Sequence, residues 1–251
     1  MHNRYARLAA RVYDLDKPVG RSFGDIEYYR QRLEGCGGPV LEPAVGNGRI
    51  FVPLLEAGFE MEGFDASEEM LGYCREECRK RGLAAGLTRR TFEDFAYDRR
   101  FAAIILPLGS FQLVTDTAAA MAVLSRLRDH LKPGGRFILD IDPIDAFLGP
   151  SGSVRSWTTP EGDLLTLRDD RVETDHVAQT TLSHLRYERW RDGSLIQTEL
   201  DLFRLRWWGV TELSLALRAA GFARVTASGN YEHGRAPRQG DDIVTFEAVR
   251  D

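Results

Sequence analysis

The residues with the most informative spacing lie in a short run of small residues that follows an apolar stretch. Ala44, Gly46 and Gly48 alternate with larger residues, and small side chains let a ligand approach the backbone closely. Glu42 precedes them, and Asp65 ends the next apolar stretch. A carboxylate at that place can accept hydrogen bonds from both hydroxyls of a ribose. This pattern predicts a site for a nucleoside-containing ligand.

Two cofactor classes carry such a nucleoside. A nicotinamide dinucleotide site uses G-x-G-x-x-G, but Phe51 stands here at the third glycine position. Glu42 would also lie close to a pyrophosphate and repel it. S-adenosylmethionine instead carries an ammonium and a sulfonium, which a nearby acid and exposed carbonyls favour. The residues therefore predict S-adenosylmethionine as the cofactor, with an NAD(P)-dependent oxidoreductase as the alternative.

The elements that must position these residues alternate between short apolar runs and amphipathic stretches. That alternation is typical of α/β proteins with a doubly wound, mostly parallel sheet, in which ligands bind at the carboxyl ends of the strands. After position 143 the pattern changes to alternating polar and apolar residues, and Asp192-Gly193 is a hairpin signal. We predict strands at 39–42, 60–65, 101–106, 136–142, 223–228 and 243–249, helices at 49–57, 67–81 and 116–131, a further helix capped by Thr211 and ended by Gly221, and an antiparallel β insertion at 151–206.

Several motifs in this order resemble the class I S-adenosylmethionine-dependent methyltransferases of the small-molecule type. The resemblance covers residues 40–142 and 208–250 and implies a Rossmann-like fold with a cofactor-binding domain at 37–150 and 207–251. The insertion would then be a lid or a dimer interface. The motifs are the acid–small–G-x-G run at 42–48, Arg49-Ile50, Pro53-Leu54, Gly63-Phe64-Asp65-Ala66-Ser67, Met70-Leu71, Leu131-Lys132-Pro133-Gly134-Gly135 and Ala219-Ala220-Gly221-Phe222.

The resemblance also implies a role for individual residues. Those that would bind the cofactor are Ala44 and Gly46 beside the methionine moiety, Glu42 at its ammonium, Asp65 at the ribose, Ala66 and Met70 on the adenine, Phe92 and Glu93 at the adenine edge, and Leu106 through its carbonyl at the methionine amine. Thr91 and Ala102 stand where many relatives carry an acid. In a subset of the family a helix with a Tyr-Asp pair, here Tyr13-Asp14, folds over the cofactor, which implies a helical lid at 1–36. Tyr13 and Arg21 are then candidate partners of the methionine carboxylate.

Methyl transfer asks the protein mainly to position its substrates and exclude water. A hydroxyl or a cationic amine also needs a general base. No residue is assigned as catalytic from the sequence, and no metal site is expected. The side chains that could take a proton are Tyr13, Asp142, His176, His184 and His233.

The predicted function is methyl transfer to nitrogen or oxygen of a small-molecule acceptor, with a non-catalytic S-adenosylmethionine-binding protein as a further alternative. The chain has 33 basic and 38 acidic residues and a net charge of −5, which disfavours nucleic acid and anionic membranes as partners. Three cysteines and the lack of a long apolar run favour a cytoplasmic protein. An exposed antiparallel module also offers a homodimer interface.

Overall fold

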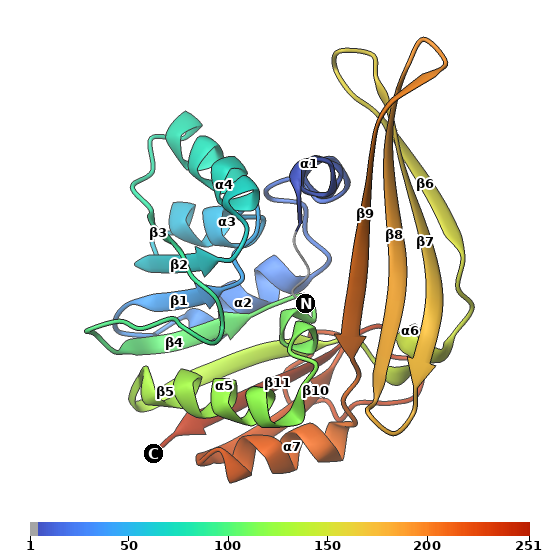
Figure 1. The fold of residues 1–251 in the computed structure, drawn as a ribbon. Coiled ribbons are helices and arrows are strands. Elements are labelled where there is room, and N and C mark those ends of the chain that lie inside the picture. The colour runs from blue at the N-terminus through green and yellow to red at the C-terminus, as the bar shows by residue number, and fades with distance from the viewer. Residues whose placement is uncertain (1–4) are drawn as a thin grey trace.

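The computed structural model describes residues 5–251, which form a seven-stranded sheet between two layers of helices and a separate four-stranded sheet beside it (Figure 1). The helices are α1 (Arg7–Asp16), α2 (Asp25–Leu33), α3 (Phe51–Glu56), α4 (Glu68–Lys80), the 3₁₀ turn η1 (Ser110–Leu113), α5 (Thr117–Asp129), α6 (Ile144–Leu148) and α7 (Val210–Ala219). The strands are β1 (Val40–Pro43), β2 (Met61–Asp65), β3 (Gly86–Arg89), β4 (Phe101–Leu106), β5 (Leu131–Ile141), β6 (Ser153–Thr158), β7 (Leu164–Asp175), β8 (Thr180–Arg191), β9 (Ser194–Arg206), β10 (Phe222–Gly229) and β11 (Val244–Arg250).

The large sheet has the order β10-β11-β5-β4-β1-β2-β3. Strands β3, β2, β1, β4 and β5 run parallel, whereas β11 pairs antiparallel with both β5 and β10. The continuous apolar run of β4 lies near the middle of this sheet, where helices cover both faces. The prediction of a doubly wound, mostly parallel sheet with an added antiparallel module is confirmed.

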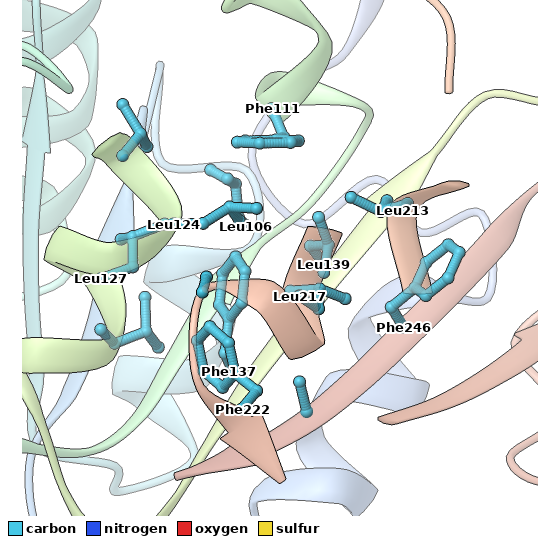
Figure 2. Packing of buried hydrophobic residues seen from close by; sticks show 14 of the residues in the cluster. Leu106, Phe111, Leu124, Leu127, Phe137, Leu139, Leu213, Leu217, Phe222 and Phe246 are labelled. Atoms are coloured by element: carbon cyan, nitrogen blue, oxygen red, sulfur yellow. The ribbon is translucent and has the colours of Figure 1, made fainter. Parts of the chain in front are cut away.

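Each face of the large sheet has its own apolar core. Helices α5 and α7 pack on one face, and α2, α3 and α4 pack on the other. Figure 2 shows part of the first core, in which Phe137 of β5 stacks on Phe222 with 5.7 Å between ring centroids. These two cores fix the carboxyl ends of β1, β2 and β4, where the predicted ligand residues lie.

The four-stranded sheet stands at the side of the α/β body, and α1 lies against it (Figure 1). Leu8, Ala9 and Val12 of α1 pack on Leu165 and Tyr187, among other residues, in a third apolar cluster. Glu199 of β9 also accepts a hydrogen bond from the Leu8 amide at 2.9 Å. Helix α1 therefore contributes to the core of the small sheet, whereas α2 contributes to that of the large one. The predicted lid at 1–36 begins with four residues outside the described part, and the domain boundaries stay predictions.

Two local predictions were wrong. Thr211 does not cap α7, because the helix begins at Val210 and the Glu212 carboxylate accepts the Gly209 amide at 3.1 Å. The strand predicted at 136–142 begins earlier, because β5 starts at Leu131 and includes residues 132–135, where it pairs with β4 through an irregular register. Within residues 5–251, the helices are too short or too polar to cross a membrane.

Candidate functional site

The loop after β1 turns sharply, because three of its residues adopt left-handed backbone conformations. Ala44 has φ +52°, Gly46 has φ +60° and Gly48 has φ +85°. A Cβ on Gly48 would lie 2.6 Å from the Cys74 sulfur of α4, so this glycine allows close packing of the loop on a helix. Sequence reasoning placed Gly48 on the ligand side, and the structure places it against α4 instead.

Asp65 holds two loops together at the end of β2. Its carboxylate accepts the Gly46 amide at 2.9 Å and the Ser67 amide at 2.8 Å. Burial raises the pKa of Asp65, and the hydrogen bonds from the backbone partly offset that effect. Ser67 in turn caps α4, where its hydroxyl accepts the Met70 amide at 3.2 Å. The acid thus joins the glycine loop to the start of α4.

A cavity of about 700 Å³ opens above these loops. Its wall brings together most of the predicted cofactor residues, which are Tyr13, Ala44, Gly46, Asp65, Ala66, Met70, Phe92 and Glu93. Phe64 lies in the same wall, and its ring meets that of Phe92 edge to face at 6.1 Å. The cavity therefore has apolar surface for a planar ring next to a carboxylate suited to hydroxyl groups.

The N-terminal segment closes one side of the cavity. Tyr5 and Tyr13 both line it, and their rings meet at right angles at 5.7 Å. The Tyr5 carbonyl accepts a hydrogen bond from the Ser67 hydroxyl at 3.0 Å. Segment 5–13 is therefore held directly beside Asp65.

A second cavity of about 30 Å³ lies under the glycine loop, and Ala44, Tyr13 and Ser110 line both cavities. Three buried polar atoms in its wall have no hydrogen-bond partner, namely Glu42 Oε2, Asn47 Oδ1 and Arg49 Nε. A buried polar atom without a partner is costly, so such atoms usually meet a water or a ligand. Burial raises the pKa of Glu42 well above its usual range, although the nearby Arg49 opposes this. The small cavity is thus equipped for a cationic or water-bridged group.

Two predicted cofactor residues lie outside both cavity walls. The Arg21 guanidinium is exposed, donates to the Asp16 carbonyl at 2.6 Å and lies 5.1 Å from the Phe23 ring centroid. Leu106 is fully buried at the end of β4, while the two residues after it, Pro107 and Leu108, line the small cavity. The structure thus brings the chain after Leu106, rather than Leu106 itself, into the wall.

A buried ion pair supports the glycine loop from α2. The Arg49 guanidinium contacts both oxygens of Asp25, and both side chains are almost fully buried. Arg49 also donates to the Arg21 carbonyl at 2.5 Å. Sequence reasoning missed Asp25, because nothing in the local pattern of α2 shows that it faces a residue 24 positions later.

Asp140 forms a second buried support, on β5. Its Oδ2 accepts the Tyr231 hydroxyl at 3.0 Å and the Leu108 amide at 3.3 Å. Leu108 has φ +54°, so this bond holds a strained turn next to the small cavity. Burial raises the pKa of Asp140 to about 7. An acid inside the apolar strand at 136–142 was the only sequence signal for this role.

The structure also separates the side chains considered as bases. His176 lies edge to face with Trp207 at 5.9 Å, and His233 lies 3.9 Å from the Glu247 carboxylate. On β8, Leu185 faces α1, and neighbouring residues of a strand point to opposite faces. His184 therefore faces the other side of the small sheet. None of the three histidines lines either cavity.

Tyr13 lines both cavities, but burial raises its pKa to about 12. It therefore keeps its proton at neutral pH and acts as a hydrogen-bond donor. Asp142 lies at the carboxyl end of the parallel strand β5 and is half-buried. Like the histidines, Asp142 lines neither cavity, but it follows the strand end beside the turn at 107–110, whose residues Pro107, Leu108 and Ser110 line the small cavity.

This mostly parallel α/β sheet, with a glycine loop after its first strand and an acid at the end of its second, has the Rossmann-like methyltransferase fold. A family model described as "Methyltransferase domain" matches residues 40–135. The cypemycin N-terminal methyltransferase of a Streptomyces species is 26% identical over 230 residues, which are 90% of each chain. The glycine/sarcosine N-methyltransferase of Halorhodospira halochloris is 29% identical over 87% of this chain and 78% of its own.

Among solved structures, the CcbJ methyltransferase of Streptomyces caelestis shares 21% identity and a TM-score of 0.79 over 99% of each chain. Residues 40–135 thus match the methyltransferase family, and the whole chain has the fold of the class I S-adenosylmethionine-dependent methyltransferases.

Proposed function

We propose that this enzyme transfers a methyl group from S-adenosylmethionine to the nitrogen of a small-molecule amine. The observation that carries the cofactor is the set of unpartnered polar atoms in the small cavity, beside an open cavity with Asp65 in its wall. Glu42 there can interact with an ammonium, which no nicotinamide dinucleotide offers at that place. The residues present therefore fit S-adenosylmethionine.

In this proposal each part of the site has a separate task. Asp65 binds the ribose hydroxyls, and Met70, Ala66 and Phe92 pack on the adenine. Glu42 and the chain after Leu106 hold the methionine ammonium, and Tyr13 donates to its carboxylate. When bound, S-adenosylmethionine supplies an electrophilic methyl group, so the chain's own work is to orient the acceptor and exclude water. Segment 5–13 performs the second task by closing the cavity.

Two observations support nitrogen over oxygen as the acceptor atom. The two relatives described above are named as a cypemycin N-terminal methyltransferase and a glycine/sarcosine N-methyltransferase, at 26% and 29% identity. Asp142 adds a carboxylate, suited to a cation, directly after the carboxyl end of β5. The acidic net charge favours a small acceptor over nucleic acid. A homodimer through the four-stranded sheet and a cytoplasmic location remain predictions.

Matched acceptor pairs test this proposal. The chain is incubated with S-adenosylmethionine and with glycine or glycolate, glucosamine or glucose, and alanylglycine or lactoylglycine, and products are followed by mass spectrometry. We expect methylation of an amine member and not of its hydroxyl partner. Methylation of hydroxyl members alone would overturn nitrogen as the acceptor. Calorimetric binding of NADH but not of S-adenosylhomocysteine would overturn the cofactor.

A further inference from the structure

Asp142 occupies a fixed position at the end of β5. The fully buried Gln112 of η1 accepts the Asp142 amide at 2.9 Å and donates to the Asp142 carbonyl at 3.2 Å. These two bonds lock the backbone of Asp142 to η1 and leave its carboxylate free to point elsewhere. The Gln112 side chain thus fixes the backbone from which the Asp142 side chain extends.

The carboxylate lies over the turn that reaches the cofactor site. Its Oδ2 is 3.0 Å from the point where a Cβ on Gly109 would stand. Gly109 has φ +66°, and the next residue, Ser110, lines both cavities. Asp142 is therefore next to the wall where the methionine end of the cofactor is proposed to bind.

Lys17, just after α1, is the charged group that faces Asp142. Burial raises the pKa of Asp142, and Lys17 opposes this by lowering it. Lys17 lies 5.0 Å from the Tyr13 ring centroid and 3.8 Å from the Asp16 carboxylate, which Arg155 of β6 also contacts at 2.9 Å. Among residues 5–251, no side chain donates a hydrogen bond to the Asp142 carboxylate. Lys17 stabilises the ionised form of Asp142, and the carboxylate oxygens stay available to a ligand.

We propose that Asp142 is the catalytic base, whose carboxylate receives a proton from the attacking nitrogen of the acceptor. This assignment rests on the proposed function. Tyr13 keeps its own proton, and Asp140 on the same strand is already bound by Tyr231 and Leu108. Of the two carboxylates at this end of β5, Asp142 is the one whose oxygens accept no hydrogen bond from the described side chains.

The proton and electron balance is simple. The acceptor arrives as an ammonium ion, and one N–H proton moves to a carboxylate oxygen of Asp142. The freed lone pair forms the bond from nitrogen to the methyl carbon, while the carbon–sulfur bond breaks and its electron pair stays on sulfur. The products are a methylammonium ion and S-adenosylhomocysteine. The Asp142 carboxylic acid then loses its proton to water when the site opens.

Three variants test the role of Asp142. Asp142→Asn removes the base and keeps the shape, and Lys17→Met removes the facing cation and keeps the length. Asp145→Asn is the matched control, because Asp145 is an exposed carboxylate on the adjacent helix α6. Rates are measured against pH on whichever acceptor the wild-type chain methylates. Calorimetry then gives the affinity of each variant for S-adenosylhomocysteine, and that of the acceptor for this complex from pH 5 to 8.

We expect Asp142→Asn to lower kcat by about 10²–10⁴-fold, because that is the usual contribution of a positioned base. Its affinity for S-adenosylhomocysteine should equal that of the wild type. An amine acceptor should bind the wild-type complex more tightly as Asp142 ionises with rising pH, and this rise should vanish in Asp142→Asn. Lys17→Met should move the rising limb of the rate profile to higher pH, because the lost cation no longer stabilises the carboxylate.

Each other outcome contradicts the assignment in a recognisable way. A raised KM with unchanged kcat in Asp142→Asn would show an acceptor-binding carboxylate and overturn the base. An equal loss in Asp145→Asn would show a general effect of charge. If the wild-type chain methylates only hydroxyl acceptors, the nitrogen proposal fails while Asp142 is still judged on those acceptors. If it methylates no acceptor at all, the proposed function and this assignment fall together.

Discussion

Replacement of Asp65 by asparagine is the most direct test of the cofactor site. The carboxylate accepts two backbone amides, from Gly46 and Ser67, and is proposed to accept the ribose hydroxyls as well. An asparagine has one accepting oxygen, so it cannot satisfy both loops and the ribose together. Hydrogen bonds to a charged group contribute about 1.5–3 kcal/mol, so we expect S-adenosylhomocysteine to bind roughly 10- to 100-fold more weakly.

The same substitution should also destabilise the fold, and a control separates the two effects. A loss of about 1–3 kcal/mol corresponds to a fall in Tm of roughly 2–12 °C for a chain of this size. Asp175 accepts the Val177 and Ala178 amides at 2.8 and 2.9 Å in the turn between β7 and β8, far along the chain from the cavity residues around Asp65. Asp175→Asn therefore removes a similar pair of backbone contacts away from the cavity, and should leave binding unchanged.

The assay is calorimetric titration with S-adenosylhomocysteine below the melting temperature of each variant. A folded Asp65→Asn variant with the wild-type dissociation constant would refute the ribose assignment. An equal loss of affinity in Asp175→Asn would show that binding merely follows stability. Only a selective loss at Asp65 agrees with a carboxylate that serves both the loops and the ligand.

Three further predictions concern the buried charges. Asp25→Asn should lower the unfolding free energy by about 3–5 kcal/mol, because it leaves Arg49 buried without a counterion. Thermal melting measures this loss, and the double variant Asp25→Leu/Arg49→Met shows whether removing both charges restores stability. The pKa of Asp140 is raised to about 7, so this group lowers wild-type stability as pH rises from its unfolded pKa of about 4 to about 7. Asp140→Asn should therefore flatten the Tm profile between pH 5 and 7, and a parallel decline in the variant would contradict this. Arg191 and Arg189 hold the pKa of Asp163 at about 2. The contribution of Asp163 to stability is therefore present above its unfolded pKa and is lost as pH falls toward 2. Asp163→Asn should have a lower Tm than the wild type at pH 7, and its Tm should fall less on acidification.

The sequence predicts the fold class because local and long-range signals agree. The apolar run 101–106 predicts a buried central strand, and Ser67 followed by two glutamates predicts the start of a helix. The structure confirms both predictions. The small residues of the loop after β1 and the acid after β2 are recognisable because parallel strands bring their carboxyl ends to one edge. Eight of the eleven predicted cofactor residues share one cavity wall, and all of them except Tyr13, which lies on α1, end or follow β1, β2 or β3.

The rest depends on contacts that no local pattern encodes. Asp25 and Arg49, or Asp140 and Tyr231, meet only after distant segments pack, and the two partners of the second pair are 91 positions apart. Thr211 looked like a helix cap by residue type, but the Glu212 side chain satisfies the Gly209 amide and starts the helix earlier. The role of Gly48 was similarly hidden, because close packing and ligand approach both select glycine.

The shared cluster of α1 and the four-stranded sheet has a consequence for exchange of parts between related enzymes. Leu8 and Glu199 are in contact although 191 positions separate them, and Arg11 and Asp16 of the same helix contact Glu161 and Arg155. A chimera that received only the foreign strands would meet a native α1 whose apolar face matches the old sheet. The small sheet should therefore be exchanged as a discontinuous unit, in which the first helix is transferred together with the late strands.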